Sequence, residues 1–317
     1  MSHRNLSKLA DEYYEWTLRT SPVAASMRGI HDYDTELGEF SREAEDRQIA
    51  ELRDMTARAR AISPWELDTE DQITREVLIF EAENAADVAE TRLAEFMVSH
   101  TMGIQAMFPV IVPQLPIETA EHADAYIERF SKIPQAYAEA NARLAEGVAN
   151  GRTPMASTAH KTVEQIDAML AAPLDQDPFT RAQLPAGMDE AEWRGRLVDL
   201  ARDHVRPGLQ AYRDMIAETV VPAGRSDDQP GLSWLPDGEA TYSRLVKQHT
   251  SLPLDPEEIH HLGLRQVEML ADEYKELGSE VLGTTDLNEI FSRLRDDPDL
   301  HFTAGADVVA ASEVAMA

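Results

Sequence analysis

Apolar residues recur every three to four positions along most of this 317-residue chain, and this spacing restricts its fold more than any other feature. After Ser41 they fall on one helical stripe, at Ile49, Leu52, Met55, Ala59 and Ile62. Similar helical segments occur near residues 119–146, 158–170, 190–220 and 237–248. The sequence has no alternating Val, Ile or Thr run flanked by Asn-Gly or Asp-Gly turns. It therefore predicts an all-α protein with long helices.

Two local patterns refine this expectation. The sequence Thr69-Glu-Asp-Gln72 resembles a capping box and opens an apolar run through Ile73 and Val77 to Val98. A proline-rich connection, 221–236, separates two helical segments. We expect an N-terminal helical region over residues 1–225 and the start of a second helical region over 226–317.

Charge and composition exclude several classes of function. The net charge of −29 repels phosphate backbones and anionic lipid surfaces, which argues against binding to nucleic acids or membranes. The chain has no cysteine, so disulfides, thiolate nucleophiles and cysteine-ligated metals are excluded. The N-terminus has no signal-peptide pattern, and the most apolar stretch, 107–117, is too short and too rich in proline to span a bilayer. We expect a cytoplasmic protein, whose acidic, arginine-rich composition fits either GC-rich coding or salt adaptation.

The stretch LDPEEIHHLGL, residues 254–264, places two acidic and two histidine side chains together. Asp255 suits an N-cap, Pro256 the first helical position, and the following glutamates the first turn, so the pattern favours a helix start. Glu257-x-x-His260 and Glu258-x-x-His261 also place possible metal ligands on one helix face. A carboxylate-bridged site needs a second such motif, and Glu118 with His122 is the only other close pair that we consider for it. The helix start is the favoured interpretation.

Motifs for other chemistry are absent from the sequence. It contains no His-Glu-x-x-His, no Gly-x-Ser-x-Gly, no Walker A loop and no Gly-x-Gly-x-x-Gly. Tyr242 and His249 are seven residues apart and share a helix face, where packing is favoured over a role in a cleft. Trp16, Trp193 and Trp234 fit core positions better than a cofactor site.

Two stretches together resemble a known bacterial family. Residues 9–34 carry a Pro-x-x-Ala-x-x-x-Gly-x-x-x-x-Asp pattern at Pro22, Ala25, Gly29 and Asp34. Residues 230–270 carry, in order, a Leu-Pro-x-Gly turn, a tyrosine, a His-Thr pair and Glu-x-x-x-x-Gly-Leu, at Leu235, Pro236, Gly238, Tyr242, His249, Thr250, Glu258, Gly263 and Leu264. Residues 294–302 also fit. The chain is similar to the domain of unknown function 885 family over nearly its whole length.

This resemblance implies a zinc carboxypeptidase-like protein of the long-helix, gluzincin type, which hydrolyses peptide or amide bonds in a deep channel. In such proteins His-Glu-x-x-His and a later Glu hold the zinc, and the intervening Glu activates the metal-bound water. That motif belongs after residues 294–302 and is missing here. The resemblance therefore implies the N-terminal part of a hydrolase, incomplete at its C-terminus, with no catalytic residue or cofactor of its own.

The resemblance also suggests residues that line the substrate channel. Gly238, Tyr242 and His249 match the block approaching the channel, and we expect them to contact a peptide-like substrate. The alternative is a stand-alone helical module that binds a peptide or a protein without catalysis. Nothing in the sequence indicates the oligomeric state.

Overall fold

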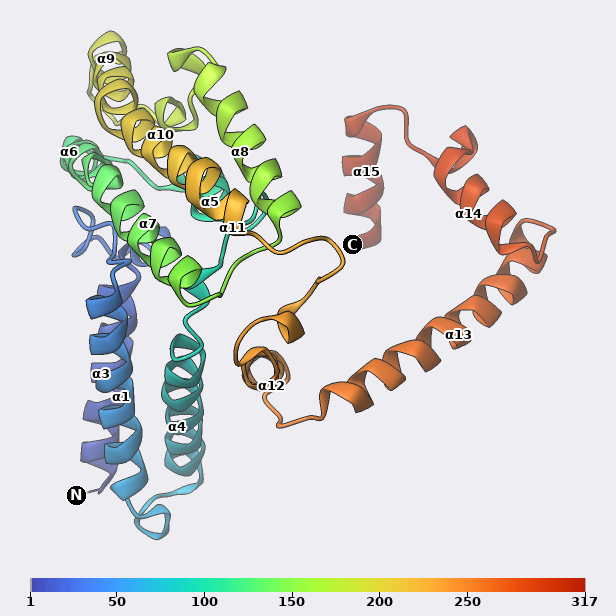
Figure 1. Cartoon of the computed structure of the whole chain (residues 1–317), viewed down its shortest axis with the longest axis horizontal. Coiled ribbons are helices and arrows are strands. Elements are labelled where there is room, and N and C mark those ends of the chain that lie inside the picture. The colour runs from blue at the N-terminus through green and yellow to red at the C-terminus, as the bar shows by residue number, and fades with distance from the viewer. Residues whose placement is uncertain (1, 317) are drawn as a thin grey trace. The chain divides into compact units, whose positions relative to one another are not determined.

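The computed structural model describes residues 2–316, and within them it is helical with no β-strand (Figure 1). This confirms the predicted all-α class. The only β-type pairing in the described residues is an isolated bridge between Met155 and Arg225. The chain forms two compact units, Met1–Pro253 and Leu254–Ala317. No helix among the described residues is long and apolar enough to cross a membrane.

The first unit begins with a layer of long helices that lie side by side (Figure 1). Its members are α1 (Ser2–Thr20), α3 (Arg42–Ala61) and α4 (Thr69–Ala89), and the short α2 (Pro22–Met27) follows α1 in the chain. Leu6 and Leu9 of α1 pack with Met55 of α3 and with Leu78 and Ile79 of α4. The layer therefore has its own small apolar core.

Side-chain caps fix where α3 and α4 begin. Ser41 Oγ accepts a hydrogen bond from Ala44 N at 3.1 Å. At α4 the cap is Asp68, whose Oδ1 accepts from Asp71 N at 2.9 Å, so the expected cap at Thr69 is wrong by one residue. Gln72 reaches back to the carbonyls of Pro64 and Leu67 instead. Asp68 caps the helix in preference to Thr69, because its carboxylate also interacts favourably with the positive end of the helix dipole.

The largest core lies among the helices that follow. These are α5 (Ile104–Ile111), α6 (Ala120–Ser131), α7 (Ile133–Ala149) and α8 (Ala156–Ala171), with the later α9 (Glu190–Leu200) and α10 (Arg206–Met215). Phe130 is fully buried and meets Phe179 and Tyr126 in edge-on contacts, with ring centroids 5.2 and 4.7 Å apart. Such edge-on pairs are the favoured packing of aromatic rings in a core.

One long helix contains two π-helical turns. It runs through α9 (Glu190–Leu200), η6 (Ala201–Val205), α10 (Arg206–Met215), η7 (Ile216–Val220) and α11 (Val221–Ala223). Besides Leu200 and Gly208, its buried residues form one stripe spaced mostly by four, at Trp193, Leu197, Ala201, Val205, Leu209, Tyr212, Ile216 and Val220. A regular α-helix has about 3.6 residues per turn, so this stripe would drift around its axis. Each π turn takes up one extra residue and keeps the stripe on the core.

The first unit ends with α12 (Gly238–Thr250), which packs on α4. Lys247 Nζ of α12 lies 3.2 Å from Asp87 Oδ2 of α4. The boundary expected between residues 225 and 226 thus lies inside the first unit, because the contacts of α12 run back to the N-terminal helices.

The second unit comprises α13 (Pro256–Val281), α14 (Leu287–Asp296) and α15 (Gly305–Met316). A close contact joins the first two of these, since a Cβ on Gly278 would lie 2.3 Å from Ile290 Cδ1. Apart from Gly278, α13 buries no residue. Within this unit its apolar stripe, which includes Leu262, Leu270 and Leu277, is therefore exposed.

Candidate functional site

The three residues expected to line a channel all lie on α12. Gly238 opens this helix, and a Cβ there would fall 1.7 Å from the carbonyl oxygen of Leu232. Packing alone thus requires glycine at this position. Tyr242 and His249 are both exposed, so the packing role that their spacing favoured is wrong. Their contact with a substrate stays a prediction.

The stretch around residues 254–264 starts a helix as expected. Asp255 caps α13 by accepting from Glu257 N at 2.8 Å, and Pro256 is the first helical residue. His261 Nε2 lies 3.4 Å from Glu257 Oε1, which is an exposed pair one turn apart. Within residues 2–316, Glu257, Glu258, His260 and His261 belong to no group of three ligand atoms close enough to share a metal ion. They do not provide the ligand set that a zinc hydrolase needs.

A second polar cluster joins the loop after α2, in which the Pro-x-x-Ala-x-x-x-Gly-x-x-x-x-Asp pattern ends at Asp34, to helix α6. Ligand atoms of His31, Asp34 and His122 all lie within 4.8 Å of one another, so these residues could approach one ion. However, Asp34 already accepts hydrogen bonds from His31 Nδ1 at 2.7 Å and from Arg129 Nη2 at 3.3 Å. The rings of His31 and His122 stack with centroids 4.0 Å apart, an orientation in which their lone pairs do not converge.

The cation beside this cluster also argues against a metal there. Arg129 is 2% exposed, and its burial lowers its pKa, an effect that Asp34 partly offsets. A divalent ion would compete with this guanidinium for the single carboxylate. We therefore interpret the cluster as an internal tie between the loop after α2 and helix α6.

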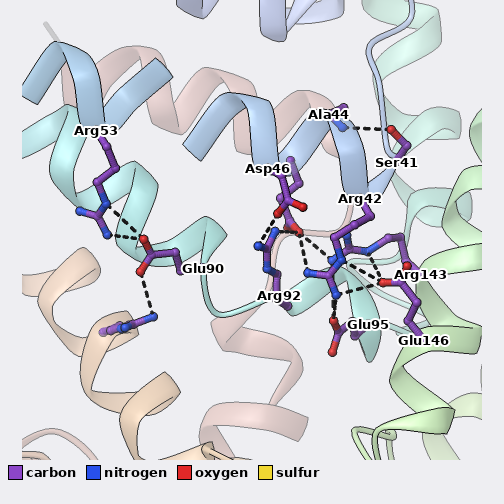
Figure 2. A network of polar contacts seen from close by, with 12 residues as sticks. Ser41, Arg42, Ala44, Asp46, Arg53, Glu90, Arg92, Glu95, Arg143 and Glu146 are labelled. Carbon is purple, nitrogen blue, oxygen red and sulfur yellow. Dashed lines mark hydrogen bonds and ion pairs between the residues drawn. The ribbon is translucent and has the colours of Figure 1, made fainter. Parts of the chain in front are cut away.

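The most extensive polar feature of the described residues is a network of ion pairs around the buried Glu95, some of them partly exposed (Figure 2). Glu95 is only 3% exposed, and it pairs with Arg42 and with Arg152, whose Nε lies 2.9 Å from Glu95 Oε2. Arg143 Nη2 donates to Glu45 Oε2 at 2.7 Å. Arg42 Nε donates to Glu146 Oε2 at 3.1 Å.

The charges of this network balance. The connected side chains are four arginines and four acids: Arg42, Arg92, Arg143, Arg152, Glu45, Asp46, Glu95 and Glu146. They come from α3, α7, the segment after α4 and, for Arg152, the connection between α7 and α8. Buried charges are costly unless they are paired. Because ion pairs of this network join α3 to α7, they hold the N-terminal helix layer against the larger core.

A cavity of about 350 Å³ opens beside the network. We call it the Arg143 cavity. Its apolar wall comprises Phe40, Leu93, Ala94, Met97, Ile104, Ala140 and Leu144. Its polar lining comprises Glu39, Ser41, Glu45, Gln48, Arg143 and Tyr212. This volume lies in the range typical of small-molecule sites.

Arg143 is the unusual member of the lining. It is 1% exposed; its Nη1 has no hydrogen-bond partner, and its Nε lies 3.6 Å from Glu146 Oε2. Nearby, burial raises the pKa of Tyr212. Burial likewise raises the pKa of Tyr137, whose ring stacks on Tyr212 with centroids 5.0 Å apart. These two phenols stay neutral at physiological pH, so they add no charge to this region.

Sequence reasoning missed the network and the cavity. The available signal was a set of charged residues at positions that should face a core, such as Arg143 beside Leu144 and Glu95 beside Phe96. A charge on an apolar face indicates a buried partner, but a single sequence does not identify that partner. Glu95 and Arg143 are 48 positions apart, so no local spacing links them.

The fold and these sites define an all-α protein whose described residues carry a buried ionic network and no recognisable hydrolase ligand set. The sequence matches the family described as "Bacterial protein of unknown function (DUF885)" over residues 22–317, so the chain belongs to this family. Comparison with curated proteins found no match.

The fold resembles one solved structure. It is described as "the putative lipoprotein from Colwellia psychrerythraea", with a TM-score of 0.83 at 18% sequence identity. The match covers 94% of this chain and 55% of that one, so the chain spans about half the length of the solved protein. At this identity the likeness establishes a shared fold only.

Proposed function

We propose that these residues form the non-catalytic, substrate-channel part of a zinc-dependent hydrolase that acts on peptide or amide bonds. In this proposal the His-Glu-x-x-His motif and the later Glu lie outside residues 1–317. No residue of this chain takes a chemical step. Gly238, Tyr242 and His249 contribute one wall of the channel.

The observation that carries this proposal is the exposed apolar stripe of α13. A 26-residue helix that buries only one glycine leaves apolar surface that soluble proteins normally cover. Additional helices of the same fold would cover it, in line with the 55% coverage of the longer solved chain. The reaction class, hydrolysis of peptide or amide bonds, is what the family resemblance described above implies.

The experiment compares these 317 residues with the product of the uninterrupted gene from which they come. We expect the 317 residues to hydrolyse no peptide and to retain no stoichiometric zinc. We expect the longer product to hydrolyse short peptides in a zinc-dependent manner that a chelator abolishes. Replacing the motif glutamate of the longer product with Gln is the matched control.

Channel residues are tested separately in the longer product. Tyr242→Phe and His249→Ala should raise KM for a peptide, and Arg265→Gln on the polar side of α13 should leave it unchanged. A gene whose product gains no zinc motif would overturn the hydrolase proposal. A peptide- or protein-binding module would then be the remaining account.

A further inference from the structure

Two cations of α12 face three acids at the end of α4. Glu83, Asp87 and Glu90 follow one another at helical spacing, so they share one face of α4. Lys247 Nζ lies 3.2 Å from Asp87 Oδ2 and 4.0 Å from Glu83 Oε2. Arg244 Nη1 lies 3.6 Å from Glu90 Oε2. We call these five residues the α12–α4 ion cluster.

Apolar burial contributes little to the later turns of α12, residues 242–250. The helix buries Gly238, Thr241 and Val246, and the first two lie in its opening turn. In the later turns Val246 is buried and Leu245 is half-buried. By contrast, α7 buries several apolar side chains in the main core. The ion cluster therefore supplies a larger share of the attachment in these turns than ion pairs do in a core helix.

The start of α12 is anchored by contacts outside the ion cluster. Gly238 packs so closely on Leu232 that a Cβ on the glycine would fall 1.7 Å from the leucine carbonyl oxygen. Just before the helix, Arg152 Nη1 donates to the carbonyl oxygen of Pro236 at 3.3 Å. Loss of the ion cluster would therefore free the later turns while the opening turn stays attached.

The backbone is strained where α12 ends. Ser251, the C-cap, has φ of 58°, which lies in the left-handed region. For a residue other than glycine this conformation costs free energy, and it persists where surrounding contacts impose it. Ser251 and Leu252 are both exposed, so few contacts other than those of α12 impose it. Release of the later turns lets Ser251 return to an ordinary conformation.

We propose that the later turns of α12 form a salt-sensitive strap, which the ion cluster holds on α4 and which added salt releases. Salt weakens attraction between exposed charges because the Debye length falls from about 10 Å at 0.1 M to about 3 Å at 1 M. The five side chains of the cluster are between 21% and 41% exposed, so screening reaches them. Tyr242 and His249 lie in these turns and are displaced when the strap is released.

The remainder of the first unit should respond to salt in the opposite direction. The chain has a net charge of −29, and repulsion among like charges destabilises its folded state. Salt screens this repulsion, so a core helix such as α7 should become no less protected. A loss of protection that is confined to residues 242–250 therefore distinguishes release of the strap from general loosening. The inference concerns only how α12 is attached, and it does not depend on the hydrolase proposal.

Hydrogen–deuterium exchange of the 317-residue chain, measured by mass spectrometry at low and high sodium chloride concentration, tests the proposal. Between about 0.05 M and about 0.5 M salt, we expect amides 242–250 to exchange about three- to tenfold faster. The amides of α7 should exchange no faster at the higher concentration. Unchanged or slower exchange of residues 242–250 would refute the strap. An equal acceleration in α7 would also refute it, because the whole fold would then be loosening.

Three variants locate the salt response. Lys247→Met removes one cation of the cluster, so it should accelerate exchange of residues 242–250 at low salt and reduce their salt response by about half or more. Arg213→Met is the matched control, because it removes one positive charge from α10, where Arg213 pairs with Asp167. This control should retain the wild-type salt response in residues 242–250, and so should Lys247→Arg, which keeps the charge. An undiminished salt response in Lys247→Met would overturn the role of the ion cluster.

Discussion

Gly147 of α7 lies directly against the backbone of Glu95, so that a Cβ on Gly147 would fall 1.9 Å from the carbonyl oxygen of Glu95. This close approach brings the helix that carries Arg143 next to the buried carboxylate. At this point α7 and the segment after α4 are in direct contact.

Gly147→Ala should destabilise the protein by about 1–3 kcal/mol or more, because neither backbone can move without disturbing the network. The measurement is urea unfolding followed by circular dichroism. Gly195→Ala is the control, since it is helical, exposed and has no atom within 4 Å of its Cβ position. That variant should gain about 0.5–1 kcal/mol from its higher helix propensity. Equal effects of the two substitutions would contradict the close approach.

Glu95→Gln should lower the free energy of unfolding by about 3–5 kcal/mol, because it leaves buried arginine charge without a partner. Asp46→Asn is the matched control in the same network. Asp46 pairs with Arg92 at the surface, where an ion pair contributes about 0–1 kcal/mol. A loss at Glu95 no larger than that at Asp46 would mean that the network contributes little to stability.

The carboxyl group of Asp87 makes the free energy of unfolding depend on pH. Burial raises the pKa of Asp87, but hydrogen bonds from Arg53 and Lys247 outweigh this effect and lower the pKa below its usual 3.8. A carboxyl whose pKa is lower in the folded state stabilises that state above pH 3.8, and this contribution disappears as the pH falls through the folded pKa.

Asp87→Asn should therefore lower the unfolding midpoint at pH 7, and the difference from the wild type should shrink below about pH 4. Thermal unfolding between pH 7 and pH 3 measures this difference. Asp11→Asn, at an exposed position of α1, should follow the wild-type profile. A constant difference across this range would exclude the ion pairs as its cause.

The exposed stripe of α13 should bind an apolar dye. Leu270→Asp combined with Leu277→Asp should reduce the fluorescence of bound 1-anilinonaphthalene-8-sulfonate, because these leucines are 45% and 57% exposed. Lys275→Asp, on the polar side of the helix, should leave the fluorescence unchanged. Undiminished fluorescence in the double variant would show that another surface binds the dye.

Helical periodicity predicted the elements well but not every buried face. Segments expected near 190–220 and 237–248 are helical, and Trp193 is fully buried as proposed. In α4, however, Ile73 and Val77 are 60% and 54% exposed, while Arg75 is buried. Arg75 donates to the carbonyls of Ile62 and Arg60, and these contacts set which face of α4 turns inward. Trp234 is likewise more exposed than its spacing suggested.

The candidate site was less predictable for a physical reason. Asp255 could be recognised as a cap because a cap depends on neighbours in sequence. The partners of Arg143 and Glu95 come from separate helices, and their cost or benefit depends on burial that a single sequence does not show. The Arg143 cavity follows from the same long-range packing.

The two π turns give the helix from α9 to α11 a tolerance to changes in length. Removing one residue from 201–205 or from 216–220 converts that turn to regular α-helix and leaves every later side chain facing as before. Removing one residue from α10 instead rotates the remainder by about 100°, and takes Ile216 and Val220 off the core. Single-codon gaps among related genes should therefore gather at these two places.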